Sequence, residues 1–284
     1  MFKKMLKSIY SKFIKTVYPS NSPKLLIIGA QKCGTTSLHY YLNQHPSFGR
    51  GLKKEAHYFN REIHFGKTLD NYESDFSGSR SKIYIDATPA YFYQPDTAMN
   101  IHKAYPNIKM LVLLRDPVKR TYSAWNHSRI RFENASYIKD KKNMQKREGD
   151  LLYEKFFQGR KTFPTFREAI DIELELIKTN SAYEPAILRR SLYLEQLEEY
   201  WKYFGKDQIK IIGFKEFVSN IKNTLGDIED FIGVEPYHWN DLKEEPKNSR
   251  GYVEPIKDED KEFLEKYFRE STKKLFEVVG EIDW

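Results

Sequence analysis

Residues 25–37 read Leu25-Leu26-Ile27-Ile28-Gly29-Ala30-Gln31-Lys32-Cys33-Gly34-Thr35-Thr36-Ser37, and this stretch decides the fold. The apolar run predicts a buried strand, the segment bounded by glycines a loop, and the hydroxyl residues the start of a helix over 35–43. Such a unit directs backbone N–H groups and a helix N-terminus at a phosphate. We therefore expect an anion-binding loop, with a plain glycine turn as the structural alternative.

The position of the lysine indicates which nucleotide chemistry this loop suits. Gly29 and Gly34 have the spacing of the nucleotide-triphosphatase loop G-x-x-x-x-G-K-[ST], but Thr35 stands where that loop has its lysine. A lysine after the second glycine reaches the β- and γ-phosphates of ATP, and the next hydroxyl holds Mg²⁺. Lys32 instead lies within the loop and would meet a nearer phosphate. This favours a donor with one 5′-phosphate bearing a transferable group, and a P-loop kinase or ATPase is the alternative.

The rest of the chain alternates predicted strands with predicted helices. The strands are expected at 25–28, 83–86, 110–114 and 209–212, and the helices at 35–43, 95–104, 118–130, 166–177, 192–204, 222–232 and 258–278. This alternation predicts an α/β, P-loop-like, three-layer fold with a central parallel sheet flanked by helices. We expect one domain over 23–284, with a mobile insertion in the charged stretch 131–161.

Basic residues are concentrated near the N-terminus. The net charge is +7, no acidic residue precedes Glu55, and residues 1–54 hold ten Lys and Arg. Residues 1–17 have the apolar spacing of one helical face, within a basic amphipathic segment over 1–22. This segment is typical of a helix on an anionic membrane surface, and a helix docked on its own domain with its lysines in water is the alternative.

Cysteine content and hydropathy bear on location. Cys33 is the only cysteine, so no intrachain disulfide forms, and no apolar run approaches the about 18 residues that a spanning helix needs. We expect a cytoplasmic protein, with peripheral contact at the inner face of a membrane left open by the N-terminal segment.

The phosphate loop also resembles that of a known family. Residues 28–38, followed by Leu42 and His45-Pro46, resemble the 5′-phosphosulfate loop of sulfotransferases that use 3′-phosphoadenosine-5′-phosphosulfate (PAPS). The likeness is greatest to the heparan-sulfate type and its bacterial relatives. It implies that Lys32 stabilises the leaving phosphate oxygen. It also implies that the donor is bound by Gln31, Lys32, Cys33, Gly34, Thr35, Thr36 and Ser37.

Two further segments match the part of this family that binds the donor's 3′-phosphate. Arg115 follows a predicted strand, at the end where α/β sheets bind ligands, and Ser123 follows eight residues later. An arginine can fork two N–H donors onto a phosphate, and the resemblance implies that Arg115 and Ser123 do so together. An arginine paired with a surface carboxylate is the alternative. The family's closing basic-glycine segment is resembled by Ser249, Arg250, Gly251 and Tyr252, for which an ordinary basic loop is the alternative.

The segment Lys53-Lys54-Glu55-Ala56-His57-Tyr58-Phe59 supplies candidate acid–base groups. In an extended stretch Glu55 and His57 face the same side, and neighbouring lysines keep Glu55 ionised. The segment resembles the family's acceptor motif, which implies that Glu55 is the base and that His57 assists. A structural histidine is the alternative for His57, and Asn60 stands where close members often have Asp.

A second acceptor motif lies at 84–92. It resembles the family's Glu-Lys-Thr/Ser-Pro-x-Tyr-Phe, and it makes Asp86, Thr88 and Tyr91 candidate substrate contacts. Thr88 and Tyr91 can also simply shape the turn. The family's usual lysine is replaced by Ala87, which indicates an acceptor less acidic than heparan.

The resemblance implies transfer of a sulfuryl group from PAPS to an acceptor hydroxyl or amine, on a carbohydrate or glycolipid. The product would be adenosine 3′,5′-bisphosphate (PAP). No metal is required by these residues, and no nucleic-acid partner is expected. A non-catalytic basic protein that binds an anionic membrane or nucleic acid is the remaining alternative.

Overall fold

The computed structural model describes residues 21–79, 81–134, 151–156, 158–179, 186–243 and 255–284. The chain forms two compact units, the first made of Met1–Leu114, Gln196–Ser249 and Ile282–Trp284, the second of Arg115–Glu195 and Arg250–Glu281.

The strands are β1 (Leu25–Gly29), β2 (Phe48–Arg50), β3 (Ile83–Asp86), β4 (Lys109–Leu114) and β5 (Ile209–Gly213). The α-helices are α2 (Thr35–Leu42), α3 (Leu69–Glu73), α4 (Thr97–Ala104), α5 (Pro117–Glu133), α7 (Leu151–Phe156), α8 (Phe166–Lys178), α9 (Tyr193–Trp201), α10 (Phe214–Ser219), α11 (Ile221–Ile232) and α12 (Asp258–Val279). Short 3₁₀ helices are η1 (Glu62–Phe65), η2 (Ser74–Phe76), η3 (Arg189–Ser191), η4 (Lys206–Gln208) and η5 (Trp239–Asp241).

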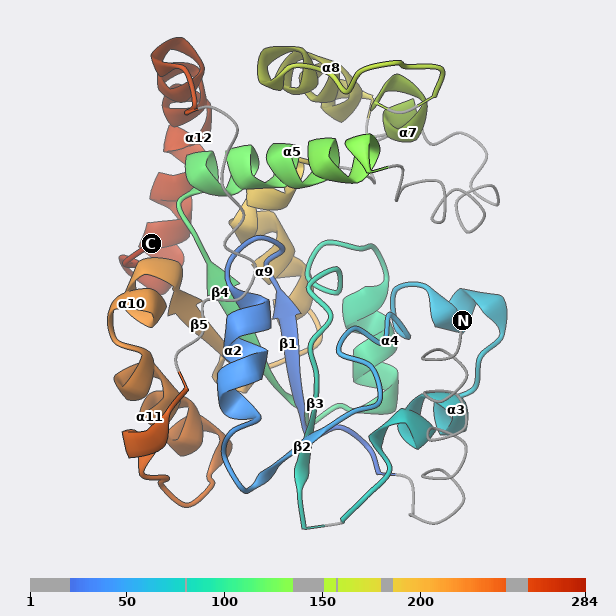
Figure 1. The fold of residues 1–284 in the computed structure, drawn as a ribbon, viewed down its shortest axis with the longest axis vertical. Helices are drawn as coiled ribbons and strands as arrows, with labels where there is room; N and C mark the ends of the chain where they lie inside the picture. The colour runs from blue at the N-terminus through green and yellow to red at the C-terminus, as the bar shows by residue number, and fades with distance from the viewer. Residues whose placement is uncertain (1–20, 80, 135–150, 157, 180–185, 244–254) are drawn as a thin grey trace. The chain divides into compact units, whose positions relative to one another are not determined.

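The first unit is built on a five-stranded sheet in the order β2-β3-β1-β4-β5, with every neighbouring pair parallel. Helices lie along this sheet (Figure 1). All five residues of β1 are buried, as expected for a parallel strand covered on both faces. The predicted α/β class with a central parallel sheet is confirmed. The short edge strand β2 was not predicted.

The strand order positions the phosphate loop. After β1 the chain forms β2 and β3 on one side of β1, and then crosses to β4 on the other side. Ligands of open α/β sheets bind outside the carboxyl ends of the strands at such a reversal. The residue that follows β1, Ala30, donates its N–H to the carbonyl of Leu113 in β4 at 2.8 Å. The loop therefore begins at the ligand-binding edge of the sheet.

The second unit is helical, and aromatic side chains fill its interior. Trp125 of α5 donates its indole N–H to the Pro164 carbonyl at 3.0 Å and lies against Phe166, the first residue of α8. A capping box of Thr165 and Glu168 starts α8. Within the predicted insertion over 131–161, α5 continues to Glu133 and α7 forms a helix. Residues 135–150 and 157 lie outside the described residues.

The basic amphipathic segment over 1–17 also lies outside the described residues, so its placement stays a prediction. Among the helices that the structure describes, none combines the length and the apolar character needed to cross a membrane.

We predict that Gly29→Ala destabilises the protein. A Cβ on Gly29 would lie 2.6 Å from the Cβ of Phe92, which cannot rotate away, and such overpacking costs about 1–3 kcal/mol. The free energy of unfolding from urea titrations measures this. The control is Gly226→Ala in α11, where no atom lies within 4 Å and helix propensity gains about 0.5–1 kcal/mol. Equal effects of the two substitutions would contradict the close approach of Phe92 to β1.

Candidate functional site

The phosphate loop follows β1 in an unusual backbone conformation. Gly34 has a φ of 87° and Lys32 a φ of 73°, both in the left-handed region. A Cβ on Gly34 would approach the Phe214 ring to 3.0 Å, so glycine is required there for space as well as for backbone angle. For Lys32 the same conformation is strained, and strained residues cluster at ligand sites. The loop thus holds the backbone of Lys32 in a conformation of raised energy.

Helix α2 begins directly after this loop. Its cap residue is Gly34, which has no side chain to cap the N–H groups of the first turn. Thr36 and Ser37 of that turn are partly exposed, whereas Cys33 and Thr35 are buried. A helix N-terminus with this arrangement suits an anion, because the helix dipole and the N–H groups both favour negative charge. The loop and the helix expected after β1 are therefore present, and binding of a phosphate there stays a prediction.

Arg115 and Ser123 belong to the second unit. Arg115 directly follows β4, and its carbonyl accepts a hydrogen bond from the Tyr193 hydroxyl at 2.7 Å. Ser123 lies on the second turn of α5 and is buried. The intervening Asp116 caps α5 by accepting the Lys119 N–H at 2.7 Å, so a helix-capping role accounts for this acidic residue. Ser249, Arg250, Gly251 and Tyr252 lie outside the described residues.

The structure brings Glu55 and His57 together in the loop after β2. The His57 Nε2 lies 3.5 Å from Glu55 Oε2, and the Lys54 ammonium lies 2.8 Å from Glu55 Oε1. The Glu55 side chain is 42% exposed and that of His57 is 23% exposed, so a solute can reach both. His57 also contacts Asn60, with Nδ1 3.3 Å from the amide oxygen. This cluster offers a carboxylate, an imidazole and an ammonium to an incoming substrate.

Neighbouring groups hold Glu55 in its ionised form. Burial raises its pKa, but the hydrogen bond to His57 and the charge of Lys54 outweigh burial and lower the pKa from 4.5 to about 2. Since the folded-state pKa is depressed, these contacts stabilise the folded state fully above about pH 4.5. That stabilisation is lost as the pH falls towards about 2.

His39 is a residue that sequence reasoning missed. It lies on α2, and burial followed by the charges of Lys54 and Arg50 lowers its pKa from 6.5 to about 4. Its Nε2 is buried and has no hydrogen-bond partner among the residues that the structure describes. His39 is therefore neutral at pH 7, close enough to Lys54 and Glu55 for their charges to act on it. No motif in the sequence marks this residue.

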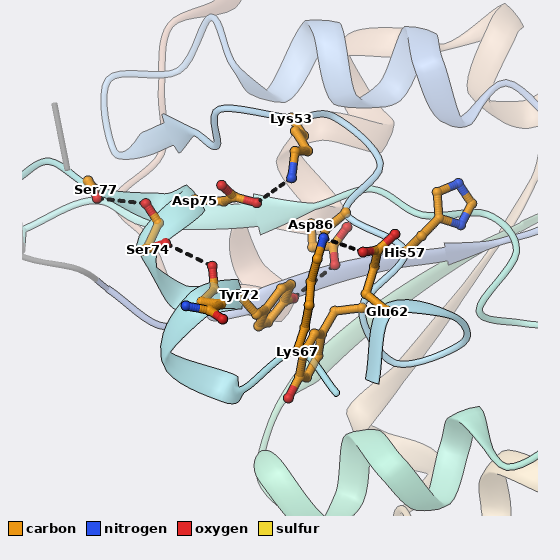
Figure 2. Close-up of polar contacts among 12 residues, drawn as sticks. Lys53, His57, Glu62, Lys67, Tyr72, Ser74, Asp75, Ser77 and Asp86 are labelled. Atoms are coloured by element: carbon orange, nitrogen blue, oxygen red, sulfur yellow. Dashed lines mark hydrogen bonds and ion pairs between the residues drawn. The ribbon is translucent and has the colours of Figure 1, made fainter. Parts of the chain in front are cut away.

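Asp86 lies at the end of β3 and is fully buried. Its carboxylate accepts hydrogen bonds from the hydroxyls of Thr88 at 2.6 Å, Tyr91 at 2.8 Å and Tyr72 at 2.8 Å. Burial raises the pKa of Asp86, and these three hydrogen bonds oppose that shift. Figure 2 shows Tyr72 and Asp86 within this group of polar contacts.

The same hydroxyls hold the loop that carries Glu55 and His57. The Thr88 oxygen accepts the N–H groups of Ala56 at 3.1 Å and His57 at 3.4 Å, and the Tyr91 oxygen accepts the N–H of Tyr58 at 3.0 Å. Thr88 and Tyr91, like Asp86, are fully buried. These three candidate acceptor contacts therefore lie beneath the loop in this structure and fix its backbone.

Metal ligands do not gather in the described part of the chain. No group of three or more His, Cys, Asp or Glu side chains among those residues is placed to hold a metal ion.

We predict that Lys54→Met raises the pKa of Glu55 from about 2 towards 4.5, because the substitution removes a charge and a hydrogen bond that favour the carboxylate. A ¹³C NMR pH titration of the Glu55 carboxyl measures the shift. Lys222→Met on the exposed face of α11 is the control and should leave this pKa unchanged. An unaltered Glu55 titration in Lys54→Met would refute the ion pair.

Comparison with known proteins gives related sequences along most of the chain. Residues 22–250 match the family model described as the sulfotransferase domain. A membrane-associated sulfotransferase, kil1, of Dictyostelium discoideum is 27% identical over 91% of this chain and 65% of its own length. The human heparan sulfate glucosamine 3-O-sulfotransferase 5 is 27% identical over 75% of this chain and 54% of its own length. The chain thus spans less than two thirds of the length of these curated relatives.

A solved structure agrees with the sequence matches. The crystal structure of a sulfotransferase from Alicyclobacillus acidocaldarius superposes with a TM-score of 0.66 and 27% identity, over 93% of this chain and 98% of that one. The family match covers the sheet, the phosphate loop and the acceptor motifs, and it confirms the resemblance inferred from residues 28–38. The chain belongs to the sulfotransferase domain family.

Proposed function

We propose that this protein transfers a sulfuryl group from PAPS to a hydroxyl or amine of a carbohydrate acceptor and releases PAP. The observation that carries the proposal is the loop between β1 and α2, which holds Lys32 inside the loop and has Gly34, a residue without a side chain, as the cap of α2. This arrangement suits the 5′-phosphosulfate of PAPS better than the triphosphate of ATP.

On the donor side, the loop N–H groups and Lys32 bind the 5′-phosphosulfate. Gln31, Thr36 and Ser37 add polar groups, and Arg115 with Ser123 takes the 3′-phosphate. Lys32 matters most during transfer, because negative charge builds on the phosphate oxygen as the S–O bond breaks. In this proposal the closing segment Ser249–Tyr252 adds contacts to the 3′-phosphate.

On the acceptor side, Glu55 takes the proton of the attacking hydroxyl or amine. A new bond forms from the acceptor atom to sulfur while the bond from sulfur to the 5′-phosphate oxygen breaks, which gives the sulfated acceptor, PAP and one proton. Lys54 keeps Glu55 ionised but weakens it as a base. His57, 3.5 Å away, helps by receiving that proton from Glu55 or by stabilising it there.

Asp86, Thr88 and Tyr91 act in this proposal as positioning residues for Glu55 and His57. Their hydrogen bonds fix the backbone at Ala56, His57 and Tyr58, and transfer needs the base within hydrogen-bond reach of the acceptor. They therefore act on the acceptor through the loop above them.

The carbohydrate class of the acceptor is supported by the relatives named for heparan sulfate. Attachment of this chain to an anionic membrane, and a glycolipid acceptor, remain predictions that rest on residues 1–17. A kinase or ATPase is disfavoured by Lys32 and Thr35, and a non-catalytic basic binder by the cluster of Glu55, His57 and Lys54.

We predict that PAP raises the melting temperature in a saturable thermal-shift titration, more strongly than Mg-ATP does. Lys32→Ala and Arg115→Ala should each weaken the shift, because each removes a cation proposed to bind a phosphate. The matched control is Lys24→Ala, which removes the same charge at the opposite, amino end of β1 and should bind PAP normally. Stabilisation by Mg-ATP and not by PAP would contradict the proposal and favour a kinase or an ATPase.

We predict that Glu55→Gln lowers kcat by about 10²–10⁴-fold while PAP binding is kept, since the amide retains the shape but cannot accept the proton. Release of PAP in the presence of acceptor measures turnover. Glu198→Gln on the exposed face of α9 is the control and should turn over normally. Full turnover by Glu55→Gln would end the assignment of Glu55 as the base.

A further inference from the structure

A small cavity opens beside the loop that carries Glu55 and His57, within the first unit. Its volume is about 190 Å³. One wall comes from this loop and the other from the segment that contains η1, α3 and η2. The lining residues are Lys53, Ala56, Tyr58, Glu62, Lys67, Asn71, Tyr72, Ser74 and Asp75.

The charged side chains that line this cavity are arranged in opposite pairs. The Lys53 ammonium lies 3.0 Å from Asp75 Oδ2, and Lys67 forms an ion pair with Glu62 (Figure 2). Burial raises the pKa of Glu62, but Lys67 and Arg61 outweigh burial and lower it, so Glu62 is ionised at neutral pH. The four lining charges therefore sum to zero.

The charges just outside the lining are also of both signs. The positive Arg61 contacts Glu62 at 3.2 Å. The negative Asp70 lies close enough to Tyr58 to add to the effect of burial, which raises the pKa of the Tyr58 hydroxyl. A carboxylate or sulfate group entering the cavity would have to compete with Asp75 or Glu62 for a lysine. An uncharged ligand rich in hydroxyls meets donors and acceptors without that competition.

The size and the remaining lining residues also suit a sugar. The exposed amide of Asn71 adds two donors and an acceptor, and Ser74 adds a hydroxyl. Tyr58 and Tyr72 stack with ring centroids 4.7 Å apart and form an aromatic part of the wall. The volume lies below the roughly 300–1,000 Å³ of pockets that enclose drug-sized ligands, so the cavity takes about one ring.

We propose that this cavity is an acceptor subsite for one uncharged sugar unit. The inference rests on the proposed sulfuryl transfer, because only an acceptor substrate must approach Glu55. Ala56 lies between Glu55 and His57 in the chain and lines the cavity, so the cavity adjoins the segment that carries both of these side chains. Tyr72 links the cavity wall to Asp86 and hence to the acceptor loop.

The test compares two tetrasaccharides as acceptors, one of N-acetylglucosamine alone and one in which N-acetylglucosamine alternates with glucuronic acid. We expect the wild-type enzyme to have the lower KM for the uncharged tetrasaccharide. Asn71→Leu removes the amide from the cavity wall and puts an apolar side chain in its place, so it should raise that KM about ten-fold, the loss expected for one or two hydrogen bonds, and leave kcat nearly unchanged. Asn223→Leu on exposed α11 is the matched control and should leave KM unchanged.

A second variant tests the charge balance directly. Glu62→Gln leaves the lining with one uncompensated positive charge, so it should shift the KM ratio about ten-fold towards the glucuronate-containing tetrasaccharide. PAP-induced thermal shifts measured on every variant report whether the fold and the donor site are intact.

The outcomes separate the subsite from the function. A wild-type preference for the uronate acceptor, or equal KM values for Asn71→Leu and Asn223→Leu with sulfuryl transfer intact, overturns the subsite alone. Absence of PAP binding by the wild-type enzyme overturns the proposed function and the subsite with it.

Discussion

The carboxyl group of Asp86 is fully buried and accepts hydrogen bonds from three hydroxyl groups, and the geometry of the loop that carries Glu55 and His57 depends on it. A buried polar group without hydrogen-bond partners is costly, and Thr88, Tyr91 and Tyr72 supply those partners to Asp86. Because the hydroxyls of Thr88 and Tyr91 donate to Asp86, their oxygens are held in place and accept backbone N–H groups from the loop that carries Glu55 and His57. The position of the loop that carries Glu55 and His57 thus follows from the hydrogen bonds made to one buried carboxyl group at the end of β3.

The parallel sheet supplies the second constraint. Because β1, β3 and β4 are neighbours with the same direction, the phosphate loop, Asp86 and the start of the segment that carries Arg115 all follow strands that end at the same edge. The left-handed conformation of Lys32 is strained, and the packed sheet supplies the energy that maintains it. The absence of a side chain at Gly34 leaves room for the neighbouring Phe214 ring. The strained conformation of the loop that holds Lys32 therefore depends on the packed sheet beneath it.

The sequence indicated the local features well and the long-range ones poorly. The apolar runs of β1 and β4 and the helices after them were predictable, because a buried parallel strand is apolar throughout. Strand β2 was missed, because Phe48–Arg50 is short and its edge position leaves no apolar run. The burial of Asp86 was not readable, since a carboxylate in a motif equally suggests a substrate contact. The cavity depends on pairs such as Lys53–Asp75, which are separated by 22 residues and meet only in the folded chain.

The network around Asp86 also determines which part of the chain can be exchanged with that of a related protein. The hydrogen bonds join residues 56–58 to Asp86, Thr88 and Tyr91, which lie about 30 residues downstream, and to Tyr72 between them. If only residues 53–59 were replaced by the loop of another sulfotransferase, the new loop would not be matched to the hydroxyl groups of Thr88 and Tyr91 that hold its backbone. A chimaera that keeps these hydrogen bonds must therefore exchange the whole segment from the end of β2 to Tyr91.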